Sequence, residues 1–138
     1  MSFLDVLYFI VPSAIFYAAP LVFTAIGGVF SERSGVINIG LEGMMVMGAF
    51  ISIIFNLTFV STFGAMTPWV AVIAAMIVSG IFALLHAVAS VSFRADQTIS
   101  GVAINMLGVA IALFTVKMIY DKGQTDYIQE RFIRFDIP

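Results

Sequence analysis

The longest uncharged stretch of the chain, residues 43–93, reads GMMVMGAFISIIFNLTFVSTFGAMTPWVAVIAAMIVSGIFALLHAVASVSF. Two further stretches, residues 6–31 and 97–116, also contain no Asp, Glu, Lys or Arg. A transmembrane helix needs about 20 consecutive, mostly apolar residues. Each shorter stretch therefore accommodates one spanning helix, and the longest accommodates two. The chain is predicted to cross a membrane several times.

The composition of the whole chain supports this prediction. Of the 138 residues, 62% are hydrophobic and 10% are charged, whereas soluble domains average about 25% charged residues. The net charge of −2 provides no basic surface for nucleic acid. The chain has no cysteine and one histidine, which excludes disulfides, thiolate metal sites and multi-histidine metal sites. We expect no metal site, no cofactor on this chain and no nucleic-acid partner.

Charged residues and helix-breaking residues divide the chain into four predicted helices. Within the longest uncharged stretch, residues 61–68 read STFGAMTP, and Gly64 and Pro68 predict a turn there. The first apolar run has no basic residue before it and is longer than a signal-peptide core, so we expect it to be a retained helix. The four helices are predicted near residues 6–30, 40–60, 68–93 and 97–119.

The expected fold class is all-α, a polytopic transmembrane helical bundle over residues 1–120. From residue 121 onward the composition changes to mixed charge, and residues 121–138 are predicted to form a polar connecting loop. Residues 1–120 are expected to lie in the lipid bilayer.

A glycine-rich segment, residues 30–43, precedes the second helix and reads FSERSGVINIGLEG. It is too polar for a regular span and too apolar for an ordinary loop. Irregular backbone at membrane depth is tolerated only where protein or water covers it. We therefore predict a broken start to the second helix, packed inside the protein.

Small and polar residues recur at helical spacing on the last three predicted helices, which is typical of helix–helix contacts in membranes. The alternative is a lined translocation pathway. The residues assigned to helix packing are Gly101, Gly108, Ser79 and Ala83. A single histidine, His86, is expected to be buried, neutral and hydrogen-bonded.

Three polar residues within the predicted spans or in the glycine-rich segment before the second one are candidates for a translocation pathway. Glu42 is a carboxylate whose placement at the centre of a span would cost roughly 2.5–3.5 kcal/mol on insertion scales. A pathway role and stabilisation of a helix N-terminus explain it equally well, and Arg33 is a possible ion-pair partner of Glu32 or Glu42. Asn38 and Asn105 would be costly if left unpaired in hydrocarbon, so they either join helices or contact substrate.

No motif of nucleophilic or phosphate-binding chemistry occurs in the sequence. We therefore expect no catalytic residue and no ATPase activity on this chain.

Two stretches resemble a known family. Residues 34–45 read SGVINIGLEGMM and residues 90–105 read SVSFRADQTISGVAIN. Both resemble the permease subunits of ABC importers for simple sugars, nucleosides and branched-chain amino acids, and they are most similar to the nucleoside-type branch. The resemblance covers nearly all of this chain but only about the first half, or less, of such a permease. Thr98 departs from the family pattern, which has an aliphatic residue there.

The resemblance implies a permease subunit in the plasma membrane that forms part of the translocation pathway of an ATP-driven importer. Its implied partners are a second permease subunit, cytoplasmic ATP-binding subunits and an extracellular substrate-binding lipoprotein. The segments 35–43 and 97–105 correspond to family motifs near the central cavity, which adds Gln97 and Ser100 to the pathway candidates Asn38, Glu42 and Asn105.

Nucleosides are the expected substrates. The alternatives are a simple-sugar permease, a small four-helix proton-coupled secondary transporter that uses Glu42, and a scaffold protein without transport activity.

Overall fold

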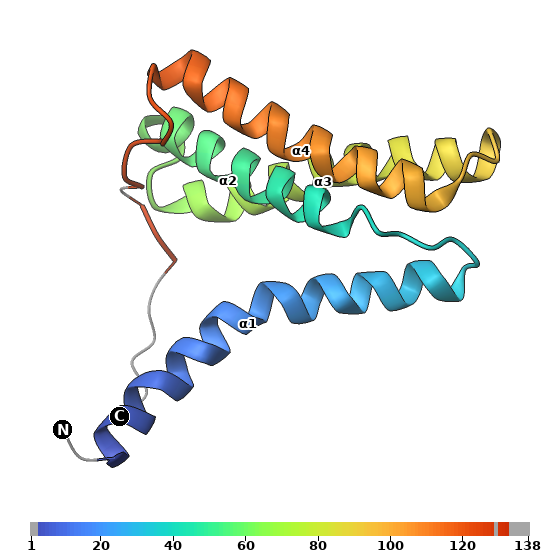
Figure 1. The fold of residues 1–138 in the computed structure, drawn as a ribbon. Helices are drawn as coiled ribbons and strands as arrows, with labels where there is room; N and C mark the ends of the chain where they lie inside the picture. Colours follow the sequence, from blue (N-terminus) through green and yellow to red (C-terminus); the bar gives the residue numbers. More distant parts are fainter. Residues whose placement is uncertain (1–2, 129, 133–138) are drawn as a thin grey trace.

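The computed structural model describes residues 3–128 and 130–132, and each regular element in this part of the chain is helical (Figure 1). The four long helices are α1 (Phe3–Arg33), α2 (Leu41–Phe63), α3 (Thr67–Ala87) and α4 (Gln97–Tyr120). A short 3₁₀ turn, η1 (Gly64–Met66), joins α2 to α3, and a π-helical turn, η2 (Val88–Ser92), extends α3. The predicted all-α membrane fold is confirmed.

Within residues 3–128 and 130–132, three continuous helical stretches are long and apolar enough to cross a membrane, and the middle one covers 52 residues, Leu41–Ser92. As one straight helix it would be about 80 Å long, far more than the hydrocarbon core of about 30 Å. The chain instead reverses at Gly64, whose φ of +49° is readily adopted by glycine. As Figure 1 shows, α2 and α3 run in opposite directions. The middle stretch therefore supplies two spans, which gives four in the part of the chain that the structure describes.

The chain reverses over fewer residues than predicted. The prediction of a turn over residues 61–68 has the right place but is too long. α2 continues to Phe63 and α3 begins at Thr67, so only the three residues of η1 remain between them. The hydroxyl of Thr67 donates to Gly64 O at 2.6 Å, and Pro68 occupies the first turn of α3. Proline is favoured there because the first-turn N–H has no helical partner in any case.

Helices α2, α3 and α4 form the packed part of the molecule. The buried apolar cluster consists of Met44 and Met47 on α2, Phe82 on α3 and Ile104 on α4. Ala83 packs against this cluster, and the hydroxyl of Ser79 donates to Met44 O at 3.3 Å. Two residues predicted to mediate helix packing, Ser79 and Ala83, thus face α2 or the shared core.

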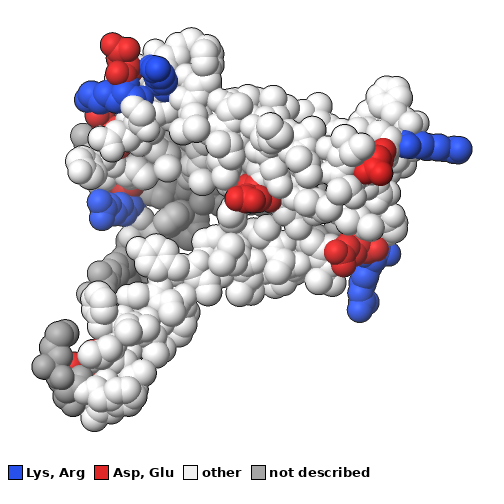
Figure 2. All heavy atoms as spheres, in the orientation of Figure 1, with Lys and Arg blue, Asp and Glu red and all other residues white. Residues whose placement is uncertain are grey.

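Helix α1 is attached differently. None of its residues is buried, and among the described helices it contacts only α2. Figure 1 shows it diverging from the bundle toward its N-terminus. On the face that Figure 2 shows, the Lys and Arg side chains of the described residues gather at the two ends of the molecule, and none lies between them. This distribution suits helices whose middle parts lie in hydrocarbon.

Four glycines bring the backbones of two chain segments into direct contact, and we call them the glycine seam: Gly40, Gly43, Gly101 and Gly108. A Cβ on Gly43 would lie 2.5 Å from Ile104 O, and one on Gly108 would lie 2.7 Å from Gly43 O. A Cβ on Gly101 would lie 2.9 Å from Gly40 N. Because these obstacles are backbone atoms, they cannot move aside as a flexible side chain would. Gly101 and Gly108, both predicted to mediate helix packing, therefore lie where α4 meets the start of α2.

We predict that Gly43→Ala destabilises the protein by about 1–3 kcal/mol, because the added methyl group would force two backbones apart. Gly80→Ala is the matched control, since a Cβ at this helical position meets nothing within 4 Å. Thermal unfolding in detergent measures both. Equal melting temperatures for the two variants would show that the seam tolerates a side chain.

Candidate functional site

The segment between α1 and α2, residues 34–40, has no regular helix and leads into the interior of the span. α2 begins only at Leu41, and Gly43 meets the backbone of Ile104 and Asn105 on α4. Asn105 is the ninth residue of α4, so this contact lies about 12 Å from the start of that helix. The second span therefore starts well inside the bundle, as Figure 1 also shows. The predicted broken, glycine-rich start of the second helix is confirmed.

Side chains from α3 and α4 satisfy the backbone of Ile37 in this segment. Ile37 N–H donates to Gln97 Oε1 at 2.7 Å, and Ile37 O lies 3.2 Å from His86 Nε2. His86 is 2% exposed, and its Nδ1 lies 3.0 Å from Ser100 Oγ. A carbonyl can only accept, so a neutral ring donates from Nε2 and accepts the Ser100 proton at Nδ1. Gln97 and His86 thus bind both backbone groups of Ile37, and Ser100 positions the ring of His86.

Asn105 performs a similar task nearer the start of α2. Its Oδ1 accepts from Gly43 N–H at 2.7 Å, and its Nδ2 donates to Ile39 O at 3.0 Å. The residue at the N-cap position of α2, Gly40, has no side chain to cap the first turn. An N-cap side chain normally accepts from such a first-turn N–H. Asn105 therefore caps α2 from a different helix, 62 residues away in the sequence.

Asn38 acts within the segment itself. Its Oδ1 accepts from Gly40 N–H at 3.0 Å, and its Nδ2 lies 3.6 Å from the sulfur of Met44. At the other end of the segment, Ser31 Oγ donates to Val36 O at 2.8 Å. Side chains thus replace helical hydrogen bonds at several successive positions, which is the condition for irregular backbone at membrane depth.

Glu42 points to the outer side of this arrangement. It is exposed, and it borders an open depression of about 420 Å³ together with Asn105, Met106, Val109 and Ala110. Among the described residues, Arg33 forms no ion pair with Glu32 or Glu42. Glu42 is also the second residue of α2, where the positive end of the helix dipole stabilises a carboxylate.

Four of the five predicted pathway residues, Asn38, Gln97, Ser100 and Asn105, thus gather around residues 36–43, while Glu42 lies on the outer surface beside Asn105. Whether any of them contacts a transported molecule stays a prediction. The close approach of Gly40 and Gly43 to α4 was not predicted from the sequence. The glycine-rich composition of the segment is the sequence feature that could have indicated it. The hydrogen bond between His86 and Ile37 joins residues 49 positions apart, and no local sequence pattern predicts it.

A bundle of four spans with one span that starts inside the membrane, held by side chains from two other helices, defines a multi-pass membrane protein of the transporter type. Residues 10–136 match the family described as the permease component of the branched-chain amino acid transport system, and the chain belongs to this family.

The relatives include permeases for nucleosides. The chain is 57% identical over all of its 138 residues to the guanosine ABC transporter permease protein NupQ of Bacillus subtilis. It is 43% identical, again over 138 residues, to the nucleoside ABC transporter permease protein NupC of Lactococcus lactis. A weaker match, 33% identity over 97 residues, links 70% of the chain to 28% of the putative glucose ABC transporter permease protein TsgC13 of Haloferax volcanii.

The chain spans 43% of the length of each of the two nucleoside permeases that it matches. No solved structure shows significant similarity to it. The predicted resemblance to nucleoside-type permeases of ABC importers is confirmed, as is the expectation of a multi-pass protein of the plasma membrane. The relatives are permease subunits, which are not enzymes themselves.

We predict that Asn105→Leu lowers the free energy of unfolding by about 2–4 kcal/mol, because Gly43 N–H and Ile39 O lose their partner at once. Hydrogen exchange at the start of α2 should become faster. Met106→Leu, next in sequence and 71% exposed, is the control and should change neither quantity. Unchanged exchange of the Gly43 amide in Asn105→Leu would show that Asn105 does not cap α2.

Proposed function

We propose that this chain forms part of the translocation pathway of an ATP-driven ABC importer for nucleosides. The observation that carries the proposal is the 57% identity to a permease named for guanosine. This match covers all 138 residues of the chain. The second nucleoside permease, at 43% identity over the same 138 residues, supports it. The two relatives come from different organisms and share the substrate class in their names.

The irregular start of α2 suits this function. Transporters commonly place substrate sites where a helix begins or ends inside the membrane, because free backbone groups and the helix dipole are available there. In this chain, Asn105 and Glu42 flank such a helix start and border the same open depression. These two residues, with Asn38, Gln97 and Ser100 behind them, remain the proposed pathway residues.

The proposed assembly contains further subunits, since a permease of this kind does not hydrolyse ATP itself. A second permease subunit would complete the pathway across the membrane. Cytoplasmic ATP-binding subunits would drive it, and an extracellular lipoprotein would deliver the nucleoside. The family and the names of the relatives support an ABC system.

The simple-sugar alternative has one specific observation in its favour, the 33% identity to a putative glucose permease. Uptake of labelled guanosine and labelled ribose in cells that lack this chain separates the two. We predict that guanosine uptake falls to the background level while ribose uptake is unchanged, and that returning the gene restores guanosine uptake. The reverse result would assign the chain to sugars.

The energy source distinguishes the proposal from a proton-coupled transporter that uses Glu42. We predict that guanosine uptake continues when a protonophore collapses the proton gradient, provided that cellular ATP is maintained by fermentation. Depletion of ATP with the gradient intact should stop uptake. The Glu42→Gln variant should respond to both treatments as the unmodified protein does. Loss of uptake with the protonophore alone would favour the secondary transporter.

A further inference from the structure

Glu42 carries its carboxylate near the middle of the span. The neighbouring helix, α4, has Asp96 just before its first residue and Lys117 in its last turn. Asn105, which borders the same depression as Glu42, lies nine residues after Asp96 and twelve before Lys117, or about 14 Å and 18 Å along the helix. Figure 2 shows acidic atoms midway between the two charged ends of the molecule. Glu42 therefore lies at the depth of the hydrocarbon core.

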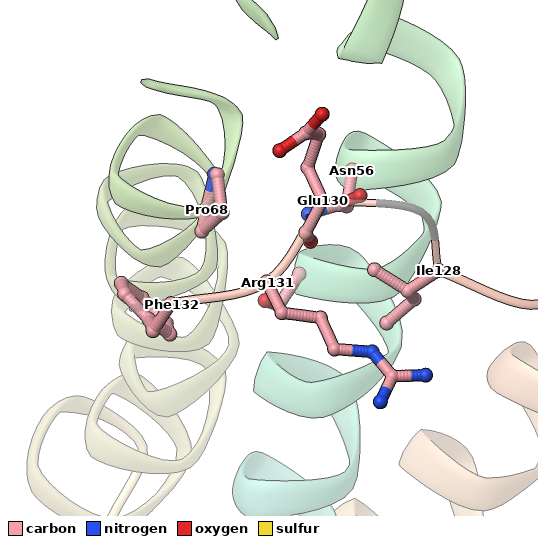
Figure 3. Close-up of a pocket in the computed structure, with 7 residues that line it drawn as sticks. Asn56, Pro68, Ile128, Glu130, Arg131 and Phe132 are labelled. Atoms are coloured by element: carbon pink, nitrogen blue, oxygen red, sulfur yellow. The ribbon is translucent and has the colours of Figure 1, made fainter. Parts of the chain in front are cut away.

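The carboxylate of Glu42 is open to the outside of the bundle. Within residues 3–128 and 130–132 it forms neither an ion pair nor a hydrogen bond, and the residue is exposed. Asn56, another polar residue of α2, is covered instead: it is 5% exposed and donates to Glu130 O at 3.2 Å (Figure 3). Ionisable side chains at membrane depth face water or a polar partner, because exposure to lipid is costly. The depression at Glu42 therefore faces a polar molecule rather than acyl chains.

Asn105 offers a donor at the same depression. Its Nδ2 has two N–H groups, and one of them donates to Ile39 O at 3.0 Å. Among the described residues, no second acceptor bonds to this nitrogen. Met106 and Val109 add apolar surface that is 71% and 40% exposed. The volume of about 420 Å³ falls in the range of about 300–1,000 Å³ that is typical of small-molecule sites.

We propose that Glu42 recognises the guanine base of a transported nucleoside, with its two oxygens accepting from N1–H and from the 2-amino group; this inference rests on the proposed nucleoside function. Of the four common nucleobases, guanine alone presents two adjacent donors on one edge. The O6 atom of guanine lies next to these donors and accepts, which suits the second N–H of Asn105. Hydrogen bonds to a carboxylate are stronger than those between neutral groups. Adenine has an acceptor nitrogen in place of N1–H, and hypoxanthine lacks the 2-amino group.

Uptake by cells that express the complete importer tests the proposal. Labelled guanosine, inosine and adenosine are each supplied below saturation, and initial rates are compared between Glu42→Gln and the unmodified protein. The amide nitrogen of glutamine cannot accept, so the 2-amino group loses its partner. The ratio of guanosine uptake to inosine uptake should fall at least about tenfold. Adenosine uptake should rise relative to guanosine uptake, because the amide donates to N1 of adenine and accepts from its 6-amino group.

The ratios isolate the effect on this chain. The substrate-binding subunit is the same in both strains, and a ratio of two rates does not depend on how much protein a strain produces. Glu32→Gln is the matched control, since it removes the same charge from an exposed residue near the end of α1. Its ratios should stay within about twofold of those of the unmodified protein, because exposed charges contribute little.

A direct measurement of binding covers the case in which Glu42→Gln transports none of the three nucleosides. Equilibrium dialysis is performed on the purified importer in detergent, without the substrate-binding subunit. The unmodified complex should bind guanosine at least about tenfold more tightly than inosine. Equal binding of the two nucleosides would overturn the inference.

Two results of the uptake experiment would also overturn it. If Glu42 pairs with a cationic side chain of another subunit, Glu42→Gln will lower the uptake of all three nucleosides by the same factor. If Glu42 only stabilises the first turn of α2, the three ratios will not change. In both cases cells with the unmodified protein still take up guanosine. Failure of the proposed function differs, because guanosine uptake is then absent from those cells as well.

Discussion

A peptide group in hydrocarbon has no water to bind, so a span that starts inside the membrane needs substitutes for its missing hydrogen bonds. In this protein the pair of hydrogen bonds from Asn105 to Ile39 and Gly43 meets that need at the start of α2. The contacts of His86 and Gln97 with Ile37 meet it a few residues earlier. Without them, residues 34–40 would have to leave the bundle or become helical.

These hydrogen bonds are possible only because the backbones approach closely. An asparagine side chain is short, so it reaches a backbone amide on another helix only where no side chain intervenes. Gly43 and Gly108 provide this approach, since a methyl group on either would overlap backbone atoms of the other segment. Polar capping and small-residue packing, which are usually treated as alternatives for intramembrane polar residues, depend on each other at this point.

Much of the fold was predictable from the sequence, because a long uncharged run can cross a bilayer in few conformations, of which the helix is the commonest. The four spans and the broken start of the second follow from charge spacing and from the glycines between residues 35 and 43. The partners of Asn105 and Gln97 could not be predicted, because they are backbone atoms 60 to 66 residues away and no local pattern encodes them. The π-helical turn η2 contains no glycine or proline, so nothing in its composition indicated it.

The contrast between two of the neighbours of α2, α4 and α1, has a consequence for motion. Where α2 meets α4, main chains interlock and leave no room for an acyl chain, so sliding there would require the two helices to separate first. Where α2 meets α1, no residue of α1 is buried, and within the described part of the chain one polar contact joins the two helices, from Thr24 to the sulfur of Met45. Of these two contacts, the one between α1 and α2 is therefore the one at which a shift of the helices would break fewer interactions.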